Sequence, residues 1–252
     1  MRRNEGADPQ ILRGGSDPLG LRLSRFWAGD LKNWNSGELH ALDADESRHL
    51  INVLRARPGL EIELLDGAGC TGSAILREQR GQIAWIECRD KIHLERGRQI
   101  TLCGPAPKGW RLPYLLEKLQ ELGVASWIPL ESARGGPPER LHPEKLRSRL
   151  REACKQSGCP WLTDIGSPLG FPALMKREGL VVLEATGATW RDLALPAHDL
   201  ILAYGPEGGF SPEELELLHG RGVQKLRLGP HVLRMETAAI VGAGLAAANF
   251  AG

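Results

Sequence analysis

The sequence predicts an α/β protein in which a small β-rich unit, residues 23–95, precedes a mostly parallel sheet with helices on both faces, residues 98–252. Two observations predict this class. Short apolar runs separated by turn residues fill the first unit, which is typical of strands joined by tight turns. In the second unit, strand-like apolar runs alternate with apolar repeats at helical spacing, the pattern of a parallel sheet covered on both faces.

The first unit follows a stretch without periodicity, residues 1–22, whose Gly, Asp and Arg content predicts a flexible leader. A helix is expected to begin after Asp43, whose carboxylate can cap it, and to end before Pro58. Three strands should follow, at Leu60–Leu65, Thr71–Leu76 and Gln82–Cys88. Together these elements predict a small β-barrel or sandwich.

The second unit is expected to hold five strands and four helices. The strands are predicted at Ile100–Cys103, Ser126–Leu130, Leu180–Glu184, Leu200–Tyr204 and Lys225–Leu228. The first helix is indicated by leucines at positions 112, 115, 116, 119 and 122, with Gly123 as its stop. The other helices are predicted at about 143–157, 212–220 and 235–249.

Composition excludes several classes of protein. With 42% hydrophobic and 25% charged residues the chain resembles ordinary soluble globular proteins. Its longest nearly uncharged stretch, Thr237–Gly252, is too short to span a membrane, so we expect no membrane partner. Five cysteines without paired metal spacing predict reduced thiols in a cytoplasmic protein and no metal site.

The net charge of +1 does not itself indicate a nucleic-acid partner. Residues 98–160 nevertheless hold eleven Lys and Arg against six Asp and Glu, an excess that could form an RNA-facing surface. The same excess could be the solvated face of one helix, and charge alone favours this second interpretation.

A glycine-containing loop, Gly205–Gly209, directly follows the predicted strand Leu200–Tyr204. Glycine allows a ligand to touch the backbone, and Ser211 with Glu214 predicts a strongly capped helix start beyond the loop. Free amides at such a start can bind an anion. The spacing matches no known phosphate loop and no Lys follows, so a simple tight turn is an equally good interpretation.

A second loop, Leu228–Ala238, contains a Gly229-Pro230 turn and places Arg234 close to Glu236. The Ala- and Gly-rich segment that follows predicts a thin helix, which another backbone can approach closely in the core or at a subunit interface. Two loops that leave neighbouring strands can wall one small-molecule pocket. The alternative to a binding site is a purely structural role for the second loop, as an ion-paired turn before a buried helix.

With these loops the sequence resembles the bacterial ribosomal RNA small subunit methyltransferase E family, which belongs to the trefoil-knotted SPOUT class and methylates N3 of a uridine in 16S RNA. Both loops match this family, and the pair is its most specific feature. The other matching segments are Arg48–Arg55, Leu65–Gly67, Lys108, Glu121–Val124, Ile128–Leu130, Ser132–Arg134 and Glu152–Gly158.

The resemblance implies an N-terminal PUA-like β-barrel that binds RNA, a C-terminal knotted α/β unit, S-adenosylmethionine as methyl donor, and a homodimer acting on the small ribosomal subunit. The donor would contact the following residues: Leu183, Glu184, Gly205, Pro206, Glu207, Gly208, Gly209, Leu228, Gly229, Leu233, Arg234, Glu236, Thr237 and Ala238. The RNA would contact Arg25, Arg48, His49, Arg55, Lys108, Arg134 and Gln156. His49 could equally be a packed side chain, and Gln156 could cap a loop.

Methylation at N3 requires loss of the N3 proton and stabilisation of charge that spreads onto O2 and O4 of the uracil. An arginine suits the second task, and the candidates are Arg25, Arg134 and Arg234, the last of them more as a structural or donor-side residue. Glu236 is a candidate proton acceptor or ion-pair partner of Arg234, and the pairing is favoured.

The chain departs from the family pattern at three positions. Lys155 and Cys159 replace a carboxylate and a guanidinium, and Ala133 replaces another carboxylate. These changes keep open a second function, a non-catalytic RNA-binding factor in ribosome assembly. A third, a nucleotide-phosphate enzyme that uses the helix start at Ser211, is disfavoured because no phosphate-loop Lys follows.

Overall fold

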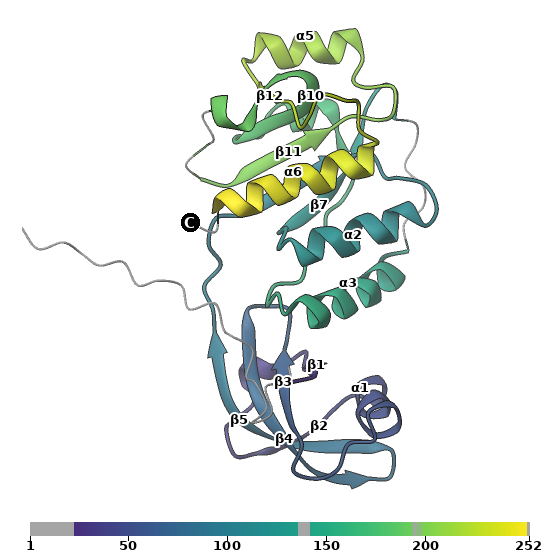
Figure 1. Ribbon diagram of the computed structural model, residues 1–252, viewed down its shortest axis with the longest axis vertical. Helices are drawn as coiled ribbons and strands as arrows, with labels where there is room; N and C mark the ends of the chain where they lie inside the picture. Colours follow the sequence, from purple (N-terminus) through teal and green to yellow (C-terminus); the bar gives the residue numbers. More distant parts are fainter. Residues whose placement is uncertain (1–22, 136–141, 194–195, 197, 251–252) are drawn as a thin grey trace, which may run out of the picture. The chain divides into compact units, whose positions relative to one another are not determined.

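The computed structural model describes residues 23–135, 142–193, 196 and 198–250. The predicted leader lies outside these residues. The chain divides into two compact units, one ending at Leu94 and the other beginning at Glu95 (Figure 1).

The first unit is a five-stranded sheet in the order β1-β3-β4-β5-β2, antiparallel except for the parallel pair β1 and β3. Its strands are β1 (Arg25–Trp27), β2 (Leu39–Ala41), β3 (Glu61–Leu65), β4 (Cys70–Arg80) and β5 (Ile83–His93). A core of apolar side chains that includes Phe26, Leu50 and Ile86 covers one face of it. The core fixes the register of the strands, because a shift by one residue would move their apolar side chains to the opposite face of the sheet.

The predicted helix of the first unit begins as expected. Asp43 accepts a hydrogen bond of 2.8 Å from the Glu46 amide and caps α1 (Ala44–Arg48). The helix then continues through one wider π-helical turn, His49–Val53. The helical segment ends before Pro58, as predicted. Arg55 adopts the left-handed conformation, with φ of 51°.

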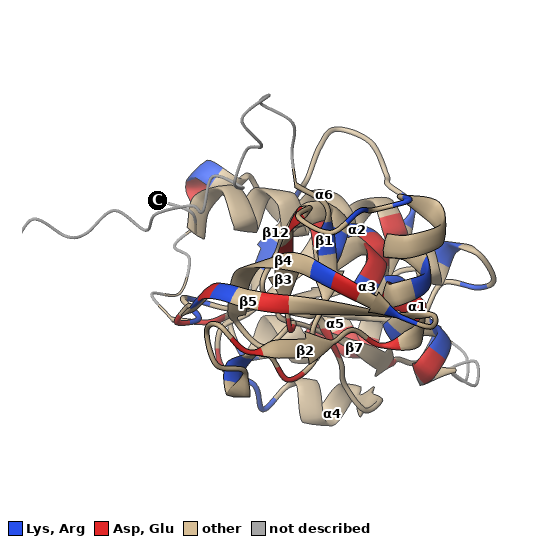
Figure 2. Ribbon diagram, turned by 90° about the horizontal axis from the view of Figure 1, so that it is seen from below, with Lys and Arg blue, Asp and Glu red and all other residues tan. Residues whose placement is uncertain are grey.

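The hairpin of β4 and β5 is longer than the apolar pattern predicts. Its additional residues are mostly polar, so periodicity could not reveal them. A cross-strand ion pair of 2.7 Å between Arg77 and Glu87 supports this exposed part. Charges of both signs lie along β5 (Figure 2).

The second unit is a seven-stranded sheet in the order β12-β10-β11-β6-β7-β8, in which β9 also pairs with β7. All these pairs are parallel. The strands are β6 (Ile100–Gly104), β7 (Ser126–Glu131), β8 (Asp164–Ile165), β9 (Leu169–Gly170), β10 (Leu180–Ala188), β11 (Leu200–Tyr204) and β12 (Gln224–Leu226). The helices are α2 (Arg111–Glu121), α3 (Pro143–Ser157), α4 (Phe171–Leu174), α5 (Pro212–Gly220) and α6 (Met235–Phe250).

Two separate cores show that helices cover both faces of this sheet, as predicted. Along β10, Val181 and Leu183 pack into a core shared with α2 and α6, whereas Leu180 and Val182 pack into a core shared with α4 and α5. This alternation is the period of two that a strand imposes on its side chains. The thin helix α6 fits closely because a Cβ at Gly242 would lie 2.9 Å from Leu183 Cδ1.

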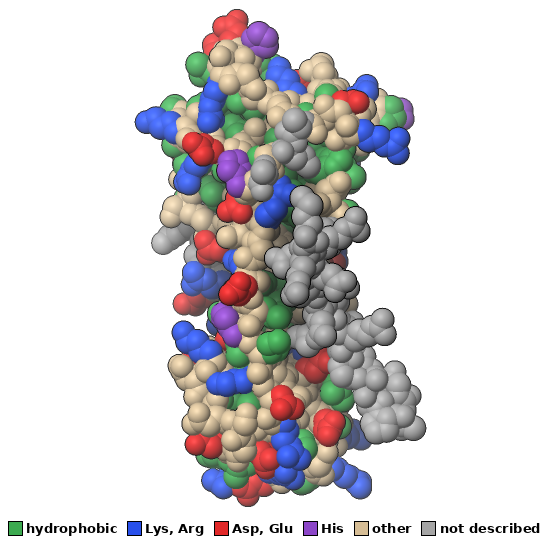
Figure 3. All heavy atoms as spheres, turned by 90° about the vertical axis from the view of Figure 1, so that its left-hand side faces the viewer, with side chains coloured by type: hydrophobic (Ala, Val, Ile, Leu, Met, Phe, Trp, Pro, Cys, Tyr) green, Lys and Arg blue, Asp and Glu red, His purple; other side chains and the backbone are tan. Residues whose placement is uncertain are grey.

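The five predicted strands and four predicted helices of this unit are all present. The ends differ most at two strands: β10 continues to Ala188 with a register shift after Leu183, and β12 ends at Leu226. The short elements β8, β9 and α4 were not predicted, because two to four residues are too few for a periodic pattern. On the face shown in Figure 3, acidic and basic side chains are intermixed rather than gathered into a patch of one sign.

Candidate functional site

A cavity of about 410 Å³ lies where β11 and β12 end, beside Leu183–Ala185 of β10. The carboxyl ends of neighbouring parallel strands are the usual place for a ligand in such sheets. Both loops singled out in the sequence wall it. Its lining comprises Arg134, Leu183–Ala185, Tyr204–Phe210, Leu215, Leu226–Gly229, His231–Leu233, Met235 and Ala238.

This lining contains every predicted donor contact except Arg234, Glu236 and Thr237. Arg234 and Thr237 are exposed, and Glu236 is buried outside the cavity wall. The lining also holds residues that the sequence did not indicate, among them Tyr204, Arg227 and His231. Tyr204 and Arg227 directly precede the two loops, and His231 lies within the second, so the residues flanking and filling each motif carried the signal.

Tyr204 lies at the wall of this cavity and is fully buried. Its hydroxyl accepts a hydrogen bond of 2.9 Å from Trp127 Nε1 and donates one of 3.4 Å to the Pro105 carbonyl. Burial raises the pKa of Tyr204, so the phenol stays neutral. The two hydrogen bonds fix Tyr204 at the end of β11.

The Tyr204 ring requires glycine at position 104 on the neighbouring strand, because a Cβ there would lie 2.3 Å from the ring. Replacing Gly104 with Ala should lower the free energy of unfolding by about 1–3 kcal/mol through overpacking. Urea denaturation measures this effect. The control is Gly220→Ala at the end of α5, where a Cβ would meet open space, and an equal loss in both variants would contradict the prediction.

The first loop leads into α5, whose first turn already has its capping hydrogen bonds within the protein. Ser211 Oγ accepts from the Glu214 amide at 3.2 Å, and Glu214 Oε2 accepts from the Ser211 amide at 2.8 Å, which is the predicted capping box. Glu214 Oε1 also accepts a bond of 2.8 Å from the Ala133 amide. A phosphate at this helix start would face carboxylates, which argues further against the nucleotide-phosphate enzyme.

Arg134 is fixed against the first loop. Its Nη1 donates to the Gly208 carbonyl at 2.8 Å and approaches the Phe210 carbonyl at 3.4 Å. The segment after β7 is thus docked to the loop by Arg134 and to the start of α5 by the Ala133 amide, which donates to Glu214. Because residue 133 contributes only its backbone amide to this second contact, the departure at Ala133 leaves it unaffected.

Glu236 has a different partner from the one predicted. Within the described part of the chain its ion pair is with Arg111, whose Nη1 lies 3.7 Å from Glu236 Oε1, rather than with Arg234. The same Arg111 atom lies 3.2 Å from Glu207 Oε1 in the first loop. The sequence could not indicate Arg111 as the partner, because it begins α2 and is far from both loops along the chain.

The predicted RNA contacts in the first unit lie in different surroundings. Arg25 forms an ion pair of 2.7 Å with Glu63, and both side chains are largely buried. Arg48 is exposed and pairs with Asp45 at 3.0 Å. His49 is exposed and packs edge-on against Phe26, with 5.8 Å between ring centroids, and Arg55 is exposed.

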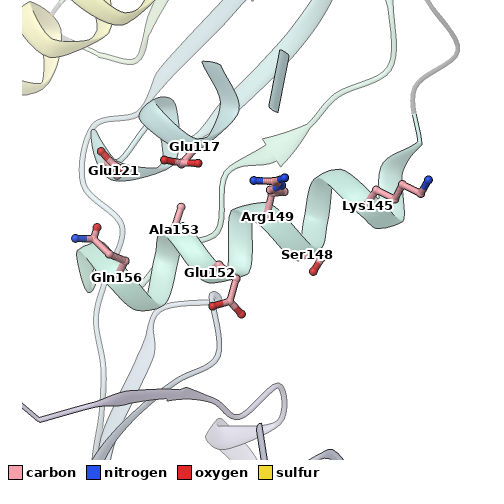
Figure 4. Close-up of a pocket in the computed structure, with 8 residues that line it drawn as sticks. All are labelled: Glu117, Glu121, Lys145, Ser148, Arg149, Glu152, Ala153 and Gln156. Carbon is pink, nitrogen blue, oxygen red and sulfur yellow. The ribbon is translucent and has the colours of Figure 1, made fainter. Parts of the chain in front are cut away.

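In the second unit, the predicted RNA contacts Lys108 and Gln156 are exposed and do not line the cavity, whereas Arg134 does. Gln156 belongs to a wider groove of about 700 Å³ between α2 and α3. Figure 4 shows Arg149 and Ala153 pointing toward α2 and Glu152 pointing away. The smaller cavity is the better candidate site, because backbone from two glycine loops converges there while the groove is lined by charges of both signs.

The departures at Lys155 and Cys159 lie at the end of α3, away from the cavity lining. Lys155 pairs with Glu152 at 2.8 Å. Burial raises the pKa of the Cys159 thiol, which favours the neutral form over the thiolate. In the same way, burial raises the pKa of Cys103 to about 12.

Within residues 23–135, 142–193, 196 and 198–250, no helix combines the length and apolarity needed to cross a membrane. The same residues contain no cluster of three or more His, Cys, Asp or Glu side chains that could hold a metal ion.

Comparison with known proteins gives matches over both units. Residues 95–247 match the family described as RNA methyltransferase domain, and residues 42–83 match the RNA methyltransferase PUA domain. The ribosomal RNA small subunit methyltransferase E of Mycobacterium bovis is 30% identical over 83% of this chain and 86% of its own.

Two of the similar solved structures match most of the chain. One is a ribosomal RNA small subunit methyltransferase E from Neisseria gonorrhoeae bound to S-adenosyl methionine, with a TM-score of 0.78 and 27% identity over 88% of this chain and 95% of that one. The other is a methyltransferase from Legionella pneumophila in complex with SAM, with a TM-score of 0.77 and 29% identity over 90% and 98%. These matches confirm the fold class predicted from the sequence.

Proposed function

The chain belongs to the ribosomal RNA small subunit methyltransferase E family, and on that premise we propose that it transfers a methyl group from S-adenosylmethionine to N3 of a uridine in 16S ribosomal RNA. The observation that carries the proposal is the convergence of the two glycine-containing loops on one cavity at the ends of β11 and β12, beside β10. Solved relatives hold S-adenosylmethionine, and this cavity suits the same ligand.

The cavity residues fit the donor in chemistry as well as in place. Apolar side chains of Leu183, Leu228 and Leu233 provide a surface for a purine ring, and the backbone of Gly205–Gly209 can approach the ligand without an intervening Cβ. The Glu184 carboxylate, held by the Thr186 hydroxyl at 2.9 Å, can accept from ribose hydroxyls. The bound donor supplies a methyl group already activated on a sulfonium.

The chain's own residues must align N3 of the uracil and stabilise the charge that spreads onto O2 and O4. Arg134 is the best-placed cation, because it lines the cavity and is fixed to the first loop. Arg234 has a donor-side or structural role, since it belongs to the second loop but its exposed side chain does not line the cavity. Glu236 acts as an ion-pair partner rather than as the proton acceptor, because it is buried behind the wall.

Isothermal titration of S-adenosylmethionine into the purified protein tests donor binding. We expect one site per chain, lost when the cavity is obstructed. Absence of binding would contradict the methyltransferase assignment. Donor binding without methylation of the RNA would instead support the non-catalytic assembly factor.

We further propose a cytoplasmic protein that contacts RNA phosphates through the exposed side chains Arg48 and Arg55 of the first unit and Lys108 of the second. Arg25 is the weakest RNA candidate, because its guanidinium is already paired with Glu63. The five cysteines are all free thiols, which suits a reducing compartment.

The second unit is proposed to form a homodimer. Trp110 is 75% exposed beside the start of α2, and Tyr114 and Val241 are exposed on α2 and α6, two helices in contact with each other. Exposed large apolar side chains of this kind are typical of a protein interface. The small side chains of α6 would let a second copy approach closely.

Replacing Trp110 with Ser and Val241 with Arg together should convert the dimer to a monomer, because a charge would replace apolar contact at the interface. Light scattering after size exclusion measures the mass. The control is Leu217→Ser, since Leu217 is also exposed but lies on α5. A dimer that survives the double substitution would place the interface elsewhere.

A further inference from the structure

One guanidinium lies between the two loops that wall the cavity. Arg111 Nη1 is 3.2 Å from Glu207 Oε1 in the first loop and 3.7 Å from Glu236 Oε1 at the start of α6, where the second loop ends. Arg111 is the first residue of α2 and does not itself line the cavity. Three segments far apart in the sequence therefore meet at one side chain.

The two ion pairs differ in strength. Glu207 has a side chain that is 67% exposed, so its pair with Arg111 contributes little by itself. The side chain of Glu236 is only 10% exposed, and its Oε2 has no hydrogen-bond partner among the residues that the structure describes. A buried carboxylate with one oxygen lacking a hydrogen bond is strongly destabilised if the cation paired with it is removed, because its charge is then left uncompensated. Glu236 therefore anchors Arg111, and the anchored Arg111 is then available to hold Glu207.

We propose that Arg111 is a positioning residue, which fixes the first loop to the start of α6 and thereby sets the width of the donor cavity. It acts through Glu207 and Glu236 and need not touch the donor. This inference rests on the proposed function only in naming the occupant of the cavity. Arg134 holds the same loop through the Gly208 carbonyl, so the loop is fixed at two points.

Amide hydrogen exchange of the protein without ligand tests the positioning directly. In Arg111→Ala we expect faster exchange in both segments 205–210 and 228–238, because both lose their shared contact. In Glu207→Gln, which leaves Glu236 paired and so preserves the fold, only segment 205–210 should exchange faster. The control is Lys118→Ala on the same helix, where a lysine also joins two carboxylates, Glu117 and Glu121, away from the cavity.

Donor titration of the same variants supplies the functional readout. Arg111→Ala should weaken S-adenosylmethionine binding about tenfold, Arg111→Lys should restore part of the loss, and Lys118→Ala should bind like the wild type. Unchanged exchange and unchanged affinity in Arg111→Ala would overturn the positioning role while the proposed function stands. Failure of the wild type to bind the donor would instead remove the proposed function, and the exchange of the two segments would still decide whether Arg111 holds them.

Discussion

Replacing Arg134 with Ala is expected to lower kcat for methyl transfer about a hundredfold, the usual loss when one stabiliser of transition-state charge is removed. Arg134 is the cation that both lines the cavity and is fixed to the first loop, through the Gly208 carbonyl at 2.8 Å. Donor affinity should change much less than kcat, because Arg111 still holds the loop through Glu207, and the loop keeps its own Gly209 to Pro206 bond of 2.8 Å and the capping box beyond it.

Single-turnover kinetics with 16S RNA, combined with donor titration, separates the two effects. The matched variant is Arg134→Lys, which keeps the charge but lacks the planar fork, and its kcat should fall between those of the wild type and of Arg134→Ala. Equal losses of donor affinity and of kcat would show that Arg134 acts on the loop and not on the uracil.

Replacing Gly205 with Val should weaken donor binding about a hundredfold, equivalent to about 2.7 kcal/mol. A Cβ at this position would lie 3.2 Å from the Phe210 amide nitrogen and 3.3 Å from the Gly209 carbonyl carbon. The branched side chain must therefore push the first loop apart, and the loop backbone is the part of the cavity that the donor would contact.

The matched control for this substitution is Gly220→Val, at an open position on the end of α5. Donor titration and thermal unfolding should be measured on both variants. A Gly205→Val protein that stays folded and binds the donor like the wild type would contradict the role of this loop.

Much of the second unit could be predicted because its signals are local. Proline and glycine punctuate the two loops, and the Ser211–Glu214 capping box is a pattern of four adjacent residues that the structure reproduces. The pocket followed from topology, because the carboxyl ends of neighbouring parallel strands must meet at one edge. The strands β1, β2, β8 and β9 escaped prediction, because they have only two or three residues.

The contacts within the site could not be predicted, because they depend on side chains that meet only after folding. Glu236 and Arg234 are near neighbours in sequence, yet Glu236 is paired with Arg111 from the start of α2. Arg25 similarly suits RNA by its type, but its pair with Glu63 on β3 is made across a parallel strand pair. A sequence pattern gives the position of a charged residue on an element and leaves its partner open.

The most direct measurement is mass mapping of 16S ribosomal RNA from a strain that lacks this gene, with and without the gene restored. We expect one uridine that carries a methyl group on N3 only when the gene is present, and that loses it again in the Arg134→Ala strain. An identical modification map in all of these strains would contradict it.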